Sequence, residues 1–455
     1  MSLTISPARV VEESDSPLLL APVSWTRRPL GEVATILNGF AFKSTQFVTL
    51  GGKPLIRIRD IFKEQTAVRY LGDYDDRYLV RPDELLVGMD GDFNCTRWRG
   101  SEALLNQRVC KITPDAEQVD LDFLTYVLPG YLRAIHDFTS STTVTHLSSR
   151  DIAQIPIPLP RLSEQRALAR VFGHANAKRE SSSRHLKAAR RAADRFRQAV
   201  LAAACSGRLT AGWRDANANV RASADLRASV VEPSAEVERE EVPSTWTRVE
   251  VGSIGDVELG GTPSRKTPSY WAGGVPWVSS GEVANSRITK TRETISSSGL
   301  ANSSAKLYPP GTVLIAMIGE GKTRGQSAIL DIEACTNQNA AAIIPDRRFV
   351  SPEYLWRWAL AQYEVARAVG RGGNQPALNK QKVRELLIAV PPLAEQAEIV
   401  RRVDKLLTLA DGISLRVEAA SRRVERSSEA VLAKACRGEL LPDTGDRPDL
   451  VSHAG

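Results

Sequence analysis

The sequence contains few cysteines, and their spacing fits neither metal ligands nor a disulfide framework. The five are Cys95, Cys110, Cys205, Cys335 and Cys436, and none belongs to a C-x-x-C pair. We therefore expect reduced thiols rather than zinc or disulfides. Long apolar runs are also missing, because no stretch approaches the roughly 18 residues that a membrane-spanning helix needs. These absences predict a cytoplasmic protein that does not contact a membrane.

Catalytic motifs are missing as well. The five histidines show no metal-ligand spacing, and neither G-x-S-x-G nor H-E-x-x-H occurs. The Asn-Pro-Pro-aromatic signature of amino-methylating enzymes and a glycine-rich turn for S-adenosylmethionine are also absent. Asp60, Asp90 and Asp92 lie in turn-rich loops, where carboxylates more often cap turns than bind magnesium. We expect a chain that is not an enzyme and holds no metal or cofactor of its own.

One segment imitates a phosphate-binding loop. Gly321-Lys322-Thr323 matches the end of G-x-x-x-x-G-K-[ST], but Ala316 stands where the first glycine is required. We interpret the segment as a glycine turn that lets Lys322 and Arg324 approach an anion. Nucleotide binding is therefore the less favoured interpretation.

Positive charge is in moderate excess. Among 455 residues, 60 Lys and Arg against 53 Asp and Glu give a formal net charge of +7 and a pI near 9.2. Such an excess favours a polyanionic partner, nucleic acid among others. The length predicts about two to four domains.

The chain contains a long internal repeat. The segment from Ser163 to Gly207 is matched by the segment from Ala394 to Gly438, and the Glu-Gln pair, a cysteine and the last glycine recur at one constant offset. Each segment follows a proline-rich turn and ends at glycine, as helices do. A helix of about 40 residues is about 60 Å long.

Both segments follow alternating spacings of four and three, the pattern of a coiled-coil seam, with polar residues at Arg179, Ser182 and Ser427 and mostly apolar residues elsewhere. The predicted seam residues are Leu168, Phe172, Ala175, Leu186, Ala189, Ala193, Phe196 and Val200 in the first segment, and Ile399, Val403, Leu406, Ala410, Ile413, Val417, Ala420, Val424 and Val431 in the second. The most economical partner for each seam is the other copy.

The segments before these helices also repeat each other. Trp25 matches Trp246 and Asn106-Gln107 matches Asn337-Gln338, at an offset that grows along the domain as insertions in loops would produce. Each copy has short β-type runs first and helices later, which predicts an α+β domain of about 140 residues. We divide the chain into a flexible leader (1–23), a first domain (24–160), a long helix (161–207), a linker (208–243), a second domain (244–391), a second long helix (392–441) and a flexible tail (442–455).

Several stretches together resemble the specificity subunit of type I restriction-modification systems, over residues 24–441. They are "IPIPLPRLSEQ" and "IAVPPLAEQAEIV", "LNGFAFKS" with "PLIRIRDI", "GGTPSRKTPSYWAGGVPWVSSGEV", the two Asn-Gln pairs, and the helix ends "AVLAAACSGRLT" and "AVLAKACRGELLP". The resemblance implies two target recognition domains of α/β type, separated by two long antiparallel helices that form a coiled coil.

The resemblance also implies the function and the partners. Each domain would read one half of a bipartite target in double-stranded DNA, and the coiled coil would set the gap. The subunit would dock two modification subunits, which are adenine methyltransferases, and restriction or translocase subunits. S-adenosylmethionine, ATP and magnesium would be held by those partners. The alternatives left open are an orphan DNA-binding protein or scaffold of the same fold, and a fused nuclease or methyltransferase.

Candidate DNA contacts are side chains that suit phosphates, guanine or adenine and that fall in turns or at strand ends. In the first domain they are Lys43, Ser44, Gln46, Arg57, Arg59, Asn94, Arg97, Trp98, Arg99, Asn106, Gln107, Arg108, Thr142 and Thr143. In the second domain they are Thr262, Ser264, Arg265, Lys266, Ser279, Ser280, Lys322, Thr323, Arg324, Asn337, Gln338, Asn339, Arg371, Asn374 and Gln375. The Asn-Gln pairs have a second interpretation: residues that read different half-sites should differ between the copies, so a shared pair would position phosphates or stabilise the fold.

Overall fold

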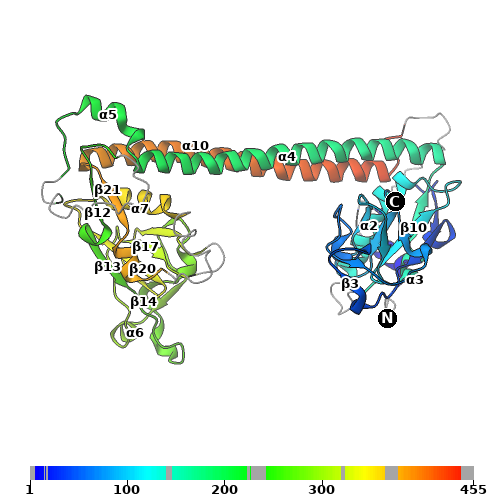
Figure 1. Cartoon of the computed structure of the whole chain (residues 1–455), viewed down its shortest axis with the longest axis horizontal. Helices are drawn as coiled ribbons and strands as arrows, with labels where there is room; N and C mark the ends of the chain where they lie inside the picture. The colour runs from blue at the N-terminus through cyan, green and yellow to red at the C-terminus, as the bar shows by residue number, and fades with distance from the viewer. Residues whose placement is uncertain are drawn as a thin grey trace, which may run out of the picture. The chain divides into compact units, whose positions relative to one another are not determined.

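The computed structural model describes residues 6–14, 16, 19–139, 146–222, 226, 242–318, 323–363 and 378–441. The chain divides into two compact units (Figure 1). Unit 1 combines Met1–Leu186 with Ala419–Gly455, and unit 2 is Lys187–Glu418. Each unit therefore contains one α+β domain and a part of each of two long helices.

Unit 1 is built from a base sheet in the order β2-β10-β7-β8, a tip sheet in the order β3-β5-β4-β9-β6, and the pair β1-β11. Its elements are α1 (Pro7–Glu13), β1 (Thr26–Pro29), β2 (Ala34–Asn38), β3 (Phe47–Val48), β4 (Lys53–Ile56), β5 (Arg69–Tyr70), β6 (Leu79–Val80), β7 (Leu85–Gly88), β8 (Cys95–Arg97), β9 (Ala103–Leu105), β10 (Val109–Pro114), α2 (Leu121–Thr139), α3 (Ser149–Ala153) and β11 (Pro156–Leu159). The helix α4 (Leu162–Cys205) begins in unit 1, and α10 (Leu393–Cys436) ends in it.

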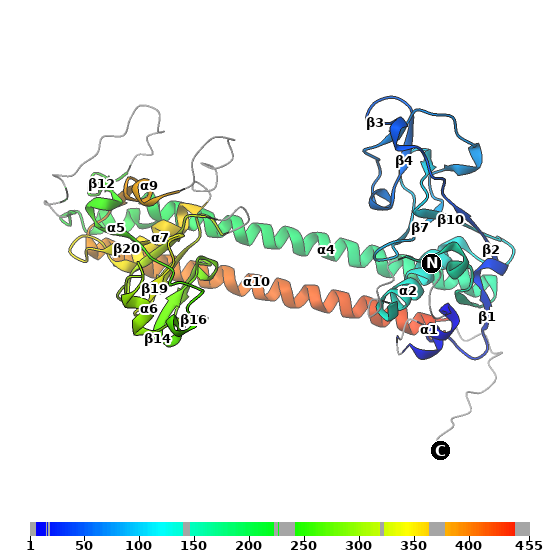
Figure 2. The ribbon, with the colours of Figure 1, turned by 90° about the horizontal axis from the view of Figure 1, so that it is seen from below.

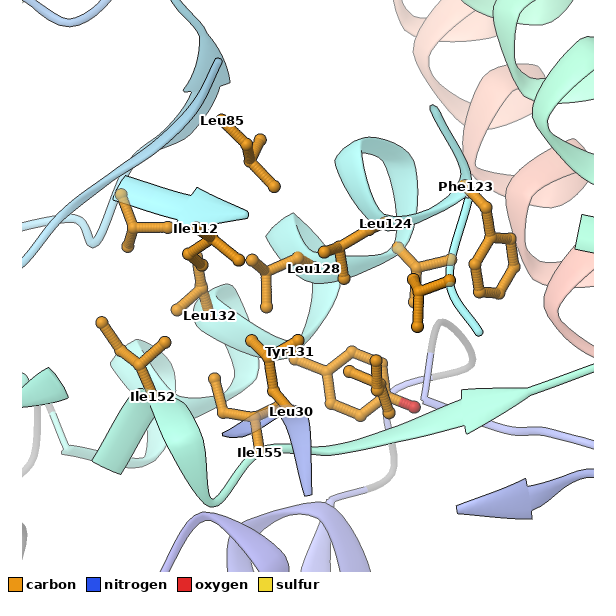
Figure 3. Packing of buried hydrophobic residues seen from close by; sticks show 14 of the residues in the cluster. Leu30, Leu85, Ile112, Phe123, Leu124, Leu128, Tyr131, Leu132, Ile152 and Ile155 are labelled. Carbon is orange, nitrogen blue, oxygen red and sulfur yellow. The ribbon is translucent and has the colours of Figure 1, made fainter. Parts of the chain in front are cut away.

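The core of unit 1 lies between α2 and the base sheet. Figure 3 shows Leu124, Leu128 and Leu132 of α2 beside Ile112 of β10. Leucines four residues apart share one face of a helix, so α2 presents a continuous apolar stripe to the strands. Each such side chain stabilises the fold by about 1.5–3 kcal/mol when it is fully buried.

Unit 2 repeats this plan. Its base sheet has the order β13-β20-β17-β18-β15, its tip sheet the order β16-β14-β19, and β12 pairs with β21. The elements are α5 (Ala211–Ala216), β12 (Thr247–Glu250), β13 (Gly255–Leu259), β14 (Trp271–Val278), β15 (Ser286–Ile288), β16 (Glu293–Ile295), α6 (Ser297–Ala301), β17 (Val313–Ala316), β18 (Ser327–Leu330), β19 (Cys335–Thr336), β20 (Ala340–Pro345), α7 (Pro352–Ala361), α9 (Lys380–Arg384) and β21 (Leu387–Val390). In Figures 1 and 2 the tip sheet of each unit lies farther from the long helices than the base sheet does.

The same glutamine joins each domain to the start of its long helix. In unit 1 Gln165 accepts a hydrogen bond from the Asp120 N–H and donates to the carbonyl oxygens of Gln118 and Pro160. In unit 2 Gln396, its counterpart in the repeat, makes the three corresponding bonds. Both glutamines are almost completely buried. The two copies of the sequence repeat thus make equivalent hydrogen bonds. The prediction of two α+β domains on two long helices is confirmed.

The two long helices run antiparallel where they meet inside a unit. In unit 2 Arg197 of α4 donates to Asp411 and Ser414 of α10, and Arg402, nearer the start of α10, donates to the carbonyl oxygen of Leu209 just beyond the end of α4. Early residues of one helix thus meet late residues of the other, as the predicted antiparallel coiled coil requires.

Most of the predicted seam is buried or half-buried, and it is best packed at its ends. Leu168, Phe172, Ala193, Val200, Ile399, Val403 and Ala410 are buried. Phe196 and Ile413 were predicted in the seam, but their side chains are 39% and 45% exposed. Polar contacts replace apolar packing beside them, because Arg197 bridges to Asp411 there.

Two other predictions need correction. Within the leader, Pro7–Glu13 forms α1: the Ser6 hydroxyl caps the helix and Val10 is fully buried, but the helix is too short to show a periodic pattern. The stretch "PLIRIRDI", one of the predicted β-type runs of the first domain, is a strand only in part, since β4 ends at Ile56 and a 3-10 turn, Ile58–Asp60, follows it. The start of the linker is helical, as a partly helical linker would be: a 3-10 turn, Arg208–Thr210, and then α5 follow the end of α4.

Candidate nucleic-acid interface

Most of the predicted contact residues lie on the tip sheets or on the turns that join tip and base sheets. In unit 1 Lys43, Ser44 and Gln46 surround the 3-10 turn Ser44–Gln46 between β2 and β3, and all three are exposed. The Gln46 amide oxygen accepts a hydrogen bond from the Tyr70 hydroxyl of β5, so this side chain is held against the sheet. The turn thus presents a lysine and a hydroxyl at the edge of the tip sheet.

Three candidates of unit 1 have structural partners instead. Trp98 is 1% exposed and donates from Nε1 to the Ser101 carbonyl oxygen, so the prediction that it contacts DNA is wrong. Arg97 is 19% exposed and is held by carboxylates of Asp83 and Asp122. Arg57 pairs with the fully buried Asp60, which closes the turn after β4.

The remaining candidates of unit 1 are more accessible. Arg59, Arg99, Gln107 and Arg108 are exposed, whereas Asn94 is half-buried. Arg108 and His146 both bond to the carboxylate of Asp90, at 2.8 and 2.6 Å. The sequence did not indicate the Asp90–His146 contact, because the two residues are 56 positions apart and no motif connects them.

The shared Asn-Gln pair marks the turn from tip sheet to base sheet. Asn106 follows β9 and Asn337 follows β19, and Asn337 is 8% exposed with its amide oxygen accepting from the Asn339 N–H. A glycine packs against each turn: a Cβ at Gly39 would lie 2.1 Å from the Asn106 carbonyl oxygen, and one at Gly260 would lie 1.8 Å from that of Thr336. Asn337 therefore stabilises the fold, which supports the second interpretation of the pair.

Unit 2 holds an arginine in a clamp. The guanidinium of Arg265 lies 3.6 Å from the ring centroid of Trp271 and 5.3 Å from that of Trp277. Both Nη atoms of Arg265 donate to the carboxylate of Glu293, one of them at 2.9 Å. This contact raises the pKa of Arg265 and lowers the pKa of Glu293. Arg265 could be predicted from the sequence, but its partners Trp271 and Glu293 could not, since the carboxylate is 28 residues away.

The two tryptophans also fix the loop before Arg265. Trp277, 2% exposed, donates from Nε1 to the Gly261 carbonyl oxygen, and Trp271 donates to that of Ser264. The Thr262 hydroxyl donates to the Gln338 amide oxygen at 2.6 Å. Ser264, Arg265 and Lys266 are therefore exposed on a loop that is anchored at both ends.

The other candidates of unit 2 differ in their surroundings: some bond to neighbouring residues and some are half-buried. Ser279 forms a capping box with Glu282, and Ser280 accepts from Asn337, so both serve local structure. Thr323 and Arg324 are half-buried. The candidates Thr142, Thr143, Lys322, Arg371, Asn374 and Gln375 lie outside the described residues.

The environment of four of the thiols disfavours their ionisation. Burial raises the pKa of Cys95 well above its usual value, that of Cys110 to about 12, and those of Cys335 and Cys436 to about 11. A thiolate is the form that attacks or binds a metal, so the raised pKa values disfavour such chemistry at these groups. The described residues contain no cluster of His, Cys, Asp and Glu that would hold a metal ion, and none of their helices is long and apolar enough to span a membrane.

Comparisons with known proteins agree with this architecture. The specificity subunit of the type I restriction enzyme EcoBI from Escherichia coli is 34% identical over 460 residues, which cover 99% of this chain and 94% of that protein. The EcoDI specificity subunit, also from Escherichia coli, is 26% identical over 81% of this chain and 80% of its own length.

A solved chain from work on complex assembly and conformational transition of the type I R-M system has the same fold. It matches with a TM-score of 0.68 at 18% identity, over 92% of this chain and 100% of that one. The family model described as the type I restriction modification DNA specificity domain matches twice, at residues 22–178 and 243–419. The chain therefore belongs to the family of type I restriction-modification DNA specificity proteins and carries two copies of its domain.

Proposed function

We propose that this protein is the DNA-recognition subunit of a type I restriction-modification complex, and that each unit reads one half of a bipartite target. The observation that carries the proposal is that the two domains share their frame but differ at the tip. The glutamine junctions and the glycine-backed turns are the same in both units, whereas the Arg265 clamp of unit 2 has no counterpart among the described residues of unit 1. A common frame with different exposed side chains suits two readers of different sequences.

The proposal assigns the chemistry to partner subunits. Modification subunits would bring S-adenosylmethionine and methylate adenine, and restriction subunits would use ATP and magnesium. We place the assembly in the cytoplasm, where its DNA target is found. This chain would supply recognition and a docking frame without catalysis. Purified alone with magnesium and S-adenosylmethionine, it should neither methylate nor cut DNA; either activity would overturn this assignment.

The experiment that tests recognition is a genome-wide map of methylated adenines in cells that express this chain with its modification subunits. A bipartite motif with a fixed gap should appear, and it should vanish when this chain alone is deleted. A chimera with residues 24–160 replaced by the matching domain of the EcoBI relative is the matched comparison. It should change one half of the motif only. No motif, or a change in both halves, would contradict two independent readers.

The long helices are proposed to set the gap. Each has 44 residues, which corresponds to about 66 Å at 1.5 Å per residue. Insertion of seven residues into both helices adds about 10 Å, or about three base pairs at 3.4 Å per step. The gap in the methylation motif should lengthen while both half-sites stay the same, and an unchanged gap would remove the spacer role.

A further inference from the structure

The clamp around Arg265 leaves one edge of the guanidinium unused. A guanidinium has five N–H donors in a planar fork. Contact with Glu293 uses the edge formed by the two Nη atoms. The other pair of donors is Nε–H and the Nη2–H that lies on the same side of the guanidinium. No described residue is bonded to Nε. The side chain as a whole is 54% exposed, so a ligand can approach it.

The clamp also fixes the plane of the guanidinium. Trp271 stacks at 3.6 Å, and it donates a hydrogen bond to the Ser264 carbonyl oxygen, so the aromatic platform and the loop hold each other. Glu293 extends from β16, next to β14, and sets the rotation of the group within that plane. An arginine fixed in this way loses little conformational entropy on binding, which favours planar, bidentate recognition.

The described part of unit 1 has no counterpart of the clamp. Trp277 corresponds to Leu55 of unit 1, because Trp277 pairs with Cys335 as Leu55 pairs with Leu104. Glu293, which pairs with Trp277, corresponds to Val68, which is bonded to Leu55. Ser44 stands where Arg265 stands when the two domains are aligned on the tryptophans that begin them. The clamp is therefore found in the second domain only, among the described residues, and belongs to the part in which the two domains differ.

We propose that Arg265 reads one guanine in the half-site recognised by unit 2, by donating from Nε and Nη2 to O6 and N7 of that base in the major groove. This is the donor pattern that guanine accepts in bidentate contacts with arginine. The inference rests on the proposed function, because it presumes that unit 2 binds a specific DNA sequence. Trp271 and Glu293 are positioning residues that act through Arg265.

The test uses the complete complex of this chain with its modification subunits and a duplex that carries the methylation motif. Each guanine is replaced in turn by 7-deazaguanine, which lacks the N7 acceptor. In the wild type, one such replacement in the half-site of unit 2 should weaken binding about 2- to 10-fold, less than loss of the whole bidentate contact, because O6 still accepts its hydrogen bond. The same replacement should have no further effect on Arg265→Ala, which has no donor at this position. Arg265→Lys keeps the charge but loses the planar fork; its ammonium can still donate to O6 or N7, so this variant should be sensitive to the replacement to an intermediate extent.

The control is Arg287→Lys. Arg287 is also exposed and bound to a carboxylate, that of Asp331, but it lies against Trp356 of α7 rather than at the tip. Its substitution should leave the recognised sequence unchanged. Glu293→Gln should relax discrimination at the same guanine to a smaller extent than Arg265→Ala.

The inference is overturned if Arg265→Ala discriminates every base as the wild type does, or if no guanine in that half-site is sensitive to the 7-deaza replacement. These results differ from failure of the proposed function itself, in which the wild-type complex shows no bipartite specificity at all. Because Arg265 is exposed, its variants should unfold at the wild-type temperature, and the half-site of unit 1 should still be recognised by them.

Discussion

Glu164 and Glu395 occupy the same position at the start of their long helices, but their surroundings differ. In unit 1 Glu164 is half-buried and accepts a hydrogen bond from the Arg161 N–H. In unit 2 Glu395 is fully buried and accepts from Arg214, Thr210 and the indole of Trp246. The partners of Glu395 come from the segment that follows α4 and from the start of the second domain. One repeated glutamate thus has a local role in unit 1 and ties three segments together in unit 2.

A second difference lies where the domain helix meets the long helix. In unit 2 Arg357 of α7 pairs with Asp404 of α10 at 2.5 Å and stacks near Trp356. The corresponding residues of unit 1 are Tyr126 and Gly173: Tyr126 lines a cavity of about 680 Å³, and its hydroxyl lies beside Gly173. The frame is therefore repeated at its backbone bonds, while the side chains around it have diverged in size and charge.

The largest expected difference between the units is in the stability lost when the repeated glutamate, Glu164 or Glu395, is replaced by alanine. Glu395→Ala leaves the guanidinium of Arg214, which is 17% exposed, without its carboxylate. Removing one partner of a buried ion pair costs about 3–5 kcal/mol, and the indole of Trp246 also loses its acceptor. Glu164→Ala removes a single hydrogen bond and should cost about 1 kcal/mol.

Hydrogen exchange on the full chain measures this difference, because β20 and β10 report unit 2 and unit 1 separately. Glu395→Ala should accelerate exchange in β20 far more than Glu164→Ala accelerates it in β10. Equal acceleration in the two variants would show that the buried glutamate is not the special feature of unit 2.

The two junction glutamines should instead give equal effects. Gln165→Leu and Gln396→Leu each remove three hydrogen bonds to backbone groups, one of them buried and two part-buried. The orphaned groups should cost about 2–3 kcal/mol in each case. Urea unfolding, combined with hydrogen exchange in each unit, measures the loss. The control is Gln198→Leu on the exposed face of α4, which should stay within about 0.5 kcal/mol of the wild type. A difference of several-fold between the two junction variants would contradict the equivalence of the two junctions.

Much of this frame could be predicted from the sequence, because its signals are local or are repeated. The Glu-Gln pairs, the spacing of apolar residues and the closing glycines placed both long helices, and Gly207 and Gly438 do adopt left-handed conformations at the helix ends. The tip could be predicted only as a set of candidates. Whether an arginine is exposed, as Arg99 is, or held by two carboxylates, as Arg97 is, depends on partners distant in the sequence.

The smallest expected difference between the units is in how the stability of each depends on pH. In unit 2 the carboxylate of Glu398 accepts hydrogen bonds from Arg401 and Arg402, which lower its pKa from 4.5 to about 2. A carboxylate with a lowered pKa stabilises the folded state at pH values above its ordinary pKa, and this stabilisation is lost as the pH falls towards the folded value. Ala167 stands at the equivalent position of unit 1, so that unit has no such contribution.

Glu398→Gln should therefore reduce the unfolding free energy at pH 7, and the gap to the wild type should narrow as the pH falls from about 5 towards 2. Arg401 is 65% exposed, so solvent screens the pair, and the gap at pH 7 should be about 1 kcal/mol or less. Urea unfolding at pH 7, 5, 4 and 3 measures it, with the exposed Glu418→Gln on the same helix as the control. A protonated glutamate and a glutamine are both neutral, so the difference in unfolding free energy between wild type and variant should shrink as Glu398 is protonated. If that difference stays constant or grows at low pH, the charge of Glu398 does not stabilise unit 2.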